Sequence, residues 1–157
     1  MKTLIIYASK YGTTEDCAFE LKNQIKGETK LINMKENSKT VDIDEFDNII
    51  IGCSIYMTRI SLEIFNFCEQ NLQKLLDKKV GIFLCCGFLE QFQEYLNQNF
   101  PKELLENAVI SQHFGAEARV SKMKFITKCM FRALTKGNHA NYVLLPDNIE
   151  AFAAEFK

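Results

Sequence analysis

The sequence predicts a single α/β domain, residues 1–157, built on a doubly wound five-stranded parallel sheet with helices on both faces. Short apolar runs, several rich in β-branched residues, alternate along the chain with longer segments of helical periodicity. Some of these runs are apolar throughout, which is typical of parallel strands buried on both faces. The chain of 157 residues is also long enough to bury such a sheet without disulfides or a structural metal.

The first half of the chain supplies three predicted strands and two predicted helices. The first helix directly follows the first strand, presents an apolar face from Cys17 to Ile25, and ends before Gly27. The third strand is the clearest, because consecutive isoleucines leave it no polar face. The strands are expected at residues 4–7, 30–34 and 48–54, and the second helix at residues 60–76.

The second half continues the alternation with two more strands and three more helices. Pro101 either ends the first of these helices or opens a short further turn. Gly137–His139 separates the last two helices. The strands are expected at residues 79–87 and 109–114, and the helices at residues 90–99, 120–136 and 147–156.

No apolar run in the sequence approaches the length of a membrane-spanning helix. The N-terminal residues enter the first strand directly, without the regions that make up a secretory signal peptide. We therefore expect a cytoplasmic protein.

The cysteines lie inside apolar patterns rather than at the spacings of a disulfide framework. The sequence has no C-x-x-C, and neither histidine lies near a cysteine in the chain, so reduced thiols are expected rather than disulfides or a zinc site. Cys85 and Cys86 are adjacent in a predicted strand, so their side chains must face opposite sides of it. The six cysteines are Cys17, Cys53, Cys68, Cys85, Cys86 and Cys129.

The net charge is −1 at pH 7, but the charges are unevenly distributed. Residues 1–117 carry 12 Lys and Arg against 17 Asp and Glu. Between Glu117 and Asp147 the chain carries six bases and no acid. The acidic remainder of the domain argues against nucleic acid as a partner.

The turn after the first strand has the composition of an anion-binding loop. A strand, a turn of hydroxyl residues and glycine, and a helix N-terminus follow one another without a gap. The first backbone N–H groups of a helix lack intrahelical partners and attract a negative charge. An ordinary helix capped by Thr13 or Thr14 is the alternative. The predicted loop consists of Ser9, Lys10, Tyr11, Gly12, Thr13 and Thr14.

The spacing of Ser9, Gly12 and Thr14 resembles the phosphate-binding loop of the flavodoxin family, Ser/Thr-x-x-Gly-x-Thr directly after the first strand. The loop lacks the Gly-Lys-Ser/Thr of a Walker loop and the three glycines of a dinucleotide fingerprint. The resemblance implies the strand order 2-1-3-4-5 and non-covalent binding of FMN. It also implies that ligands lie beyond the carboxyl ends of the first and third strands.

The same resemblance places the flavin ring against the loops that follow the third and fourth strands. Tyr56 is the expected stacking residue, and packing of its ring on the surface of the third helix is the alternative. We expect no protein side chain to act as acid, base or nucleophile, and no metal ligands, because the flavin itself carries the electron chemistry. The residues expected to frame the ring are Cys53, Ser54, Ile55, Tyr56, Met57, Gly87, Phe88 and Leu89.

A narrower resemblance is to the flavodoxin-domain branch that includes menaquinone-dependent protoporphyrinogen dehydrogenases. It is carried by residues 51–56, by Phe114–Ala116, and by the Lys/Arg-rich helix before the last helix. The chain differs in having no basic residue between Lys79 and Lys102, where that branch has a basic loop, which argues against a porphyrin substrate. Classical flavodoxins are strongly acidic and often have a glycine in the loop after the third strand. The near-neutral charge of this chain and the lack of glycine between Gly52 and Gly81 therefore argue against a one-electron shuttle.

The predicted helix 120–136 has two faces. Met123, Ile126, Met130 and Leu134 share one face, and Lys124, Lys128 and Arg132 share the other, with Phe125 among the bases. Either the helix packs on the domain with a solvated basic face, or that face contacts an anionic membrane surface or an acidic redox partner. The contact residues would be Arg119, Lys122, Lys124, Phe125, Lys128, Arg132 and Lys136.

Three functions are consistent with these patterns. The first is an FMN-dependent oxidoreductase that passes electrons to a quinone or another small acceptor, peripheral to the inner face of the membrane if the basic helix binds lipid. The second is a flavodoxin-type electron carrier. The third is a flavin-free interaction module on the same fold, which a colourless protein unable to take up FMN would indicate.

Overall fold

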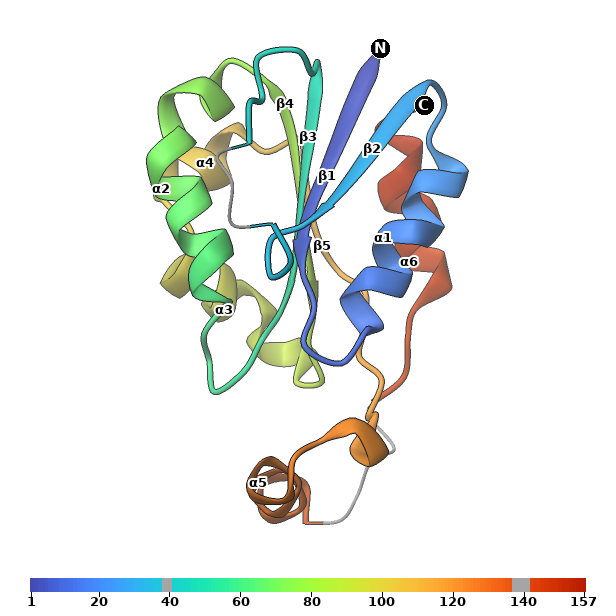
Figure 1. Ribbon diagram of the computed structural model, residues 1–157, viewed down its shortest axis with the longest axis vertical. Coiled ribbons are helices and arrows are strands. Elements are labelled where there is room, and N and C mark those ends of the chain that lie inside the picture. The colour runs from blue at the N-terminus through green and yellow to red at the C-terminus, as the bar shows by residue number, and fades with distance from the viewer. Residues whose placement is uncertain (38–40, 137–141) are drawn as a thin grey trace.

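Five parallel strands form one sheet in the order β2-β1-β3-β4-β5, as the sequence predicts (Figure 1). The computed structural model describes residues 1–37, 41–136 and 142–157. The β1–β3 pairing begins at Thr3 and Asn48, and the β3–β4 pairing at Asn48 and Lys79. The strands are β1 (Lys2–Ala8), β2 (Glu28–Asn33), β3 (Asn48–Ser54), β4 (Lys79–Cys85) and β5 (Ile110–His113).

The helices occur where the sequence places them, with shifted ends. Helix α2 begins after Ser61 rather than at Ile60, because the Ser61 hydroxyl caps it by accepting from the Ile64 N–H. Pro101 does open a further short helix, α4. The helices are α1 (Thr13–Gln24), α2 (Leu62–Leu76), α3 (Phe92–Asn99), α4 (Lys102–Asn107), α5 (Phe125–Thr135) and α6 (Pro146–Ala154), with 3-10 turns η1 (Leu89–Gln91) and η2 (Val120–Lys122).

The helices divide the core into two layers. Helices α2, α3 and α4 cover one face of the sheet, and α1 and α6 cover the other (Figure 1). Alternate residues of β4 show why: Ile82 and Leu84 are buried on the first side and Phe83 on the second. Cys85 and Cys86 likewise face opposite layers, as expected from their adjacency.

Aromatic rings fill the layer between the sheet and α6. The Phe83 ring stacks on Phe114 with a centroid distance of 4.5 Å and meets Phe152 edge-on at 6.1 Å. Gly52 on the neighbouring strand leaves room for it, because a Cβ there would lie only 2.1 Å from the Phe83 ring. Glycine at this place in β3 is therefore required by packing.

Helix α5 lies away from the sheet, beyond the carboxyl ends of the strands (Figure 1). The prediction of a single helix at residues 120–136 is wrong, since the backbone at Met123 is extended and separates η2 from α5. The predicted separator Gly137–His139 and the side chain of Leu134 lie outside the described residues. Within the described ranges, no helix has the length and apolar character needed to cross a membrane.

Candidate functional site

The loop between β1 and α1 is held by hydrogen bonds within the loop and to the first turn of the helix. The Gly12 N–H donates to Ser9 Oγ at 2.9 Å, and the Asp16 N–H donates to the Gly12 carbonyl at 3.0 Å, which starts the helix. Gly12, with φ of 94°, is the N-cap residue and makes no side-chain cap. The alternative of Thr13 or Thr14 as the cap is therefore wrong.

Two hydroxyl groups of this loop are buried without a hydrogen-bond partner among the described residues. They are Thr14 Oγ1 and Tyr11 Oη. Thr14 lies close enough to the Cys85 thiol to lower the pKa of that thiol. The two groups nevertheless do not meet the geometry of a hydrogen bond. A buried polar atom normally has a partner. Together with the first N–H groups of α1, these hydroxyls form a set of donors available to an anion.

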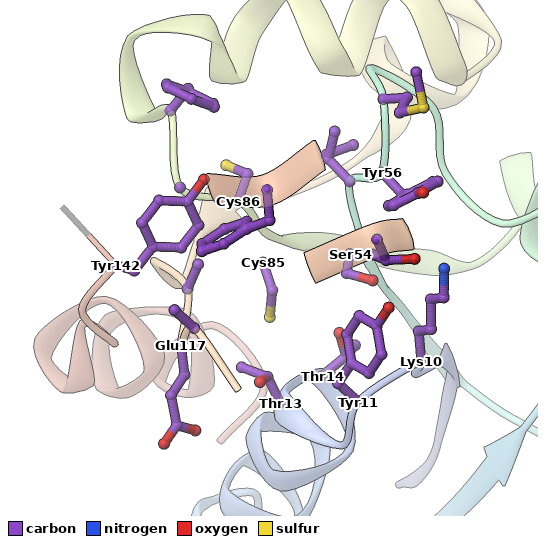
Figure 2. A pocket seen from close by; sticks show the side chains of 18 of the residues that line it. Lys10, Tyr11, Thr13, Thr14, Ser54, Tyr56, Cys85, Cys86, Glu117 and Tyr142 are labelled. Carbon is purple, nitrogen blue, oxygen red and sulfur yellow. The ribbon is translucent and has the colours of Figure 1, made fainter. Parts of the chain in front are cut away.

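A cavity of about 560 Å³ opens beside these donors, at the carboxyl edge of the sheet (Figure 2). Its volume is that of a small-molecule or cofactor site. The loops after β1, β3 and β4 contribute to its walls, as expected. The predicted site residues that line it are Ser9, Lys10, Tyr11, Thr13, Thr14, Ser54, Ile55, Tyr56, Met57, Gly87 and Phe88.

Three predicted site residues do not line the cavity. Cys53 is fully buried in the layer under α2, because successive strand residues face opposite sides and Ser54 takes the position toward the cavity. Leu89 packs against the same layer. Gly12 faces Arg119 rather than the cavity.

The loop after β3 forms a tight turn. The N–H and carbonyl groups of Tyr56 and Arg59 bond each other at 2.9 and 3.0 Å, and Met57 and Thr58 between them have φ of 47° and 67°. Buried Asn99 of α3 holds this turn, since its Nδ2 donates to the Thr58 carbonyl at 2.9 Å. A turn with two left-handed residues that are not glycine is strained and depends on such support.

Tyr56 borders the cavity with 43% of its surface exposed. The Lys10 ammonium lies over its ring, 4.0 Å from the centroid, and so connects the loops after β1 and β3. Tyr56 is therefore a wall residue of the cavity.

Sequence reasoning missed about half of the lining. Ala116, Glu117 and Ala118 lie in the connection that follows β5 at the same carboxyl edge, so the topology could have indicated them. No sequence pattern pointed to the contribution of α5. The missed residues are Thr58, Cys85, Cys86, Gln91, Tyr95, Ala116, Glu117, Ala118, Met123, Thr127, Met130, Phe131 and Tyr142.

Helix α5 uses the apolar face that the sequence predicts only in part, since Met130 of that face lines the cavity and Ile126 does not. Thr127, Met130 and Phe131 line the cavity, whereas Ile126 is 73% exposed. Met123, which precedes the helix, also lines the cavity. Phe131 contacts Tyr142 at a ring-centroid distance of 5.0 Å.

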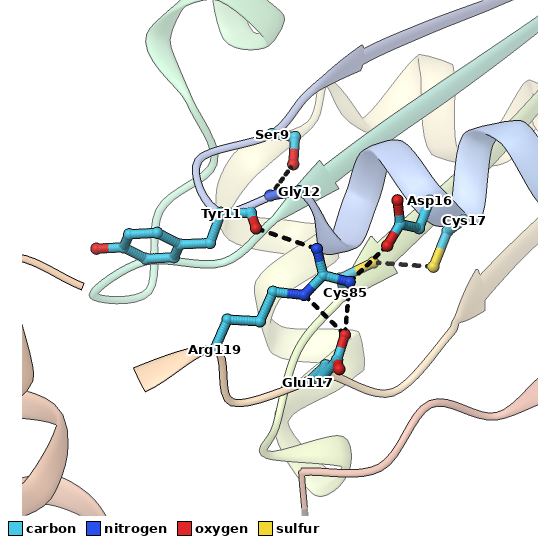
Figure 3. A network of polar contacts seen from close by, with 8 residues as sticks. All are labelled: Ser9, Tyr11, Gly12, Asp16, Cys17, Cys85, Glu117 and Arg119. Atoms are coloured by element: carbon cyan, nitrogen blue, oxygen red, sulfur yellow. Dashed lines mark hydrogen bonds and ion pairs between the residues drawn. The ribbon is translucent and has the colours of Figure 1, made fainter. Parts of the chain in front are cut away.

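Two of the thiols meet beside the cavity. Cys85 Sγ lies 3.9 Å from Cys17 Sγ (Figure 3). The contact with Cys17, followed by burial, raises the pKa of Cys85 well above its usual value. Burial also raises the pKa of Cys86, to about 12. Both thiols therefore stay protonated at neutral pH and are poor nucleophiles.

Arg119 connects the start of the basic segment to the loop after β1. Its guanidinium bonds the Tyr11 carbonyl at 3.2 Å and pairs with Asp16 at 2.5 Å and Glu117 at 2.7 Å (Figure 3). The hydrogen bond with Asp16, then that with Glu117, raises the pKa of Arg119. Arg119 is thus an internal contact rather than part of a free basic surface.

The flavodoxin domain model matches residues 4–142 of the chain. The chain belongs to the flavodoxin domain family. The match covers the loop after β1 and all residues that line the cavity. No curated protein matches the chain by sequence.

Solved flavodoxin-like structures share the fold at low identity. Rubredoxin oxygen:oxidoreductase from Desulfovibrio gigas is 17% identical with a TM-score of 0.56, over 99% of this chain and 35% of that chain, so the present chain spans about a third of it. A Lactobacillus acidophilus flavoprotein in complex with FMN is 18% identical, with a TM-score of 0.55 over 71% and 92% of the two chains. Flavodoxin 1 from Bacillus cereus is 19% identical, with a TM-score of 0.53 over 88% and 99%.

Proposed function

We propose that this protein binds FMN in the cavity at the carboxyl edge of the sheet and passes electrons to a quinone or another small acceptor. The Thr14 hydroxyl, buried without a hydrogen-bond partner among the described residues, carries the proposal, because it lies among the first N–H groups of α1 beside a cavity with apolar and aromatic walls. A phosphate accepts hydrogen bonds from such donors, and a flat ring fits such walls. FMN, when bound, supplies the electron chemistry.

The residues of the chain divide into two roles. Residues 9–14 would hold the phosphate through hydroxyl and backbone N–H donors. Tyr56, Gly87 and Phe88 would contact the ring. The thioether of Met130 and the ring of Phe131, both from α5, would limit the access of water to it. Nothing in this arrangement requires a side chain to transfer a proton.

We propose FMN rather than FAD, because a solved flavoprotein with the same fold is in complex with FMN and the sequence offers no second phosphate cradle. The narrower likeness to quinone-linked protoporphyrinogen dehydrogenases supports an oxidoreductase that uses a quinone. A flavodoxin-type electron carrier and a flavin-free interaction module are the competing functions. Uptake of FMN excludes the module, and rapid reduction of a soluble quinone by the loaded protein distinguishes the oxidoreductase from the carrier.

Replacement of Thr14 by valine tests the site. We expect Thr14→Val to weaken FMN binding by about 1–3 kcal/mol, since a hydrogen bond to a charged group is lost. Thr29→Val is a matched control, because the Thr29 hydroxyl is also buried without a partner among the described residues but lies on β2, away from the cavity. Titration of visible absorbance measures both affinities. Equal FMN affinity in Thr14→Val and Thr29→Val would show that Thr14 does not bind the phosphate.

The outer face of α5 is the basis of a second proposal, peripheral contact with an anionic membrane surface. Phe125 is 81% exposed and Ile126 73% exposed beside Lys124 and Arg132. Bases attract an anionic surface by roughly 1 kcal/mol each, and exposed apolar side chains add contact at the interface. Arg119 does not contribute, because Asp16 and Glu117 already pair with it.

Sedimentation with lipid vesicles tests this contact. We expect binding to anionic vesicles that falls as salt rises, and little binding to neutral vesicles. A Lys124→Gln/Lys128→Gln/Arg132→Gln variant should not bind. The control, Lys22→Gln/Lys26→Gln/Lys30→Gln, removes three bases elsewhere and should bind like the wild type. If both triple variants bind equally, α5 is not the contact.

A further inference from the structure

Arg119 reaches the loop after β1 from a distant part of the chain. It lies 108 positions after Tyr11, yet its Nη1 donates to the Tyr11 carbonyl at 3.2 Å. Its Nη2 pairs with Asp16 in the first turn of α1 at 2.5 Å. Only 18% of its side chain is exposed. Arg119 therefore holds the loop and the start of α1.

Gly12 provides the space for this contact. A Cβ at Gly12 would lie 2.7 Å from Arg119 Nη1. Glycine is needed here for two reasons: its φ of 94° is left-handed, and the guanidinium packs directly on its Cα. The glycine of the loop and Arg119 thus form one unit, although the sequence separates them.

The charges around the loop give Arg119 a second effect. Asp16 belongs to α1, and Glu117 lines the cavity, so two carboxylates lie near the predicted phosphate position. Both would repel a phosphate. The guanidinium contacts both and offsets part of their charge.

We propose that Arg119 is a positioning residue for phosphate binding: it holds the Tyr11–Gly12 backbone in place and offsets the charges of Asp16 and Glu117. The affinity for a phosphate-bearing flavin then depends on a residue of the β5–α5 connection. This inference rests on the proposed binding of FMN. It also implies that loss of Arg119 loosens the connection that leads to α5.

Titration with FMN and riboflavin tests the proposal, because riboflavin has the same ring without the phosphate. We expect Arg119→Gln to weaken FMN binding roughly tenfold or more, as loss of charged hydrogen bonds does, and to change riboflavin binding less than about twofold. Arg59→Gln is the control, since Arg59 also bonds a backbone carbonyl near this edge, that of Gln98, without lining the cavity. It should change neither affinity.

A second substitution separates the two effects of Arg119. If charge compensation contributes, Asp16→Asn in the Arg119→Gln background should recover a few-fold of the lost FMN affinity. If Arg119→Gln weakens FMN and riboflavin equally, or neither, the proposal is wrong and Arg119 only stabilises the fold.

Limited trypsin digestion provides a readout without flavin. The connection and α5 offer Lys122, Lys124, Lys128 and Arg132 as cleavage sites, and the apoprotein of Arg119→Gln should be cut there faster than wild type or Arg59→Gln. Equal rates would show that Arg119 does not hold the connection. A wild type that binds neither FMN nor riboflavin would overturn both the proposed function and the proposed effect of Arg119 on FMN affinity. The digestion rates would then still show whether Arg119 holds the connection to α5.

Discussion

The two sides of the cavity are built differently. The loops after β1, β3 and β4 continue strands whose side chains are buried on both faces of the sheet. Helix α5 lies off the sheet and presents Phe125 and Ile126 to solvent. Its connections are made by side chains, through the Arg119 ion pairs and through the rings of Phe131, Tyr142 and Phe88.

The difference shows that one part of the site is built from the sheet and its loops, whereas the other part is built from a helix outside the sheet. The loops on the first side continue strands of the buried core, so we expect them to open less readily than α5. The α5 side lies off the sheet, so we expect it to open at a lower free energy than global unfolding. We expect the phosphate end to be fixed and the cover over the ring to be adjustable.

Thiol reactivity should distinguish the two sides most strongly. Cys129 on α5 is exposed, whereas burial raises the pKa of Cys68 and of Cys86 to about 12. At pH 8 their thiolate fraction is then roughly one part in ten thousand. Iodoacetamide at pH 8 should therefore modify Cys129 within minutes and leave the other cysteines intact, as peptide mass spectrometry would show. Rapid modification of Cys85 or Cys86 would mean that the loop side also opens.

Truncation of aromatic rings compares stability on the two sides. Phe83→Ala removes a fully buried ring that packs on Phe114 and Phe152, and we expect a loss of about 3–5 kcal/mol in the free energy of unfolding. Phe125→Ala removes an exposed ring and should change it by less than about 0.5 kcal/mol. Urea denaturation measures both. A large loss at Phe125 would contradict the comparison.

Asn99 tests how the core supports the turn after β3. Its side chain accepts from the Ile60 N–H at 3.1 Å and donates to the Thr58 carbonyl, so Asn99→Ala leaves buried groups unpaired and should cost about 1–3 kcal/mol. Asn97→Ala on the same helix removes an exposed amide and should have little effect. Thermal denaturation compares them. Equal losses would show that the turn does not depend on this amide.

The fold could be predicted from the sequence because apolar strand runs and segments of helical periodicity alternate along the whole chain. The isoleucines of β3 can only be buried, and the alternation of strands and helices leaves few topologies. Most of the loop residues of the site were also predictable, since the carboxyl ends of β1, β3 and β4 meet at one edge. Even the error at Cys53 was avoidable, because strand alternation assigns it and Ser54 to opposite faces.

The contributions of Arg119 and Tyr142 could not be predicted in the same way. The Arg119 contact depends on how the connection after β5 folds back, and no local pattern encodes that. A Cβ at Gly87 would lie 2.5 Å from the Tyr142 ring, so a single glycine in one loop marks a contact from a remote segment. The bases near Arg119 in the sequence suggest a solvent-facing basic surface. In the structure, however, Arg119 pairs with Asp16 and Glu117 instead.

The segment that carries α5 leaves the domain and returns to it at one point. The Ala116 N–H donates to the Val143 carbonyl at 3.2 Å, the Leu145 N–H donates to the Phe114 carbonyl at 3.0 Å, and Gly115 forms a bridge with Leu144. Because its ends are joined, the length between them has only a small entropic effect on the rest of the fold. We therefore expect the segment to be an exchangeable cassette whose replacement would leave the sheet intact. Arg119 lies within the cassette, so an exchange that alters the cover over the cavity also alters the support of the loop after β1.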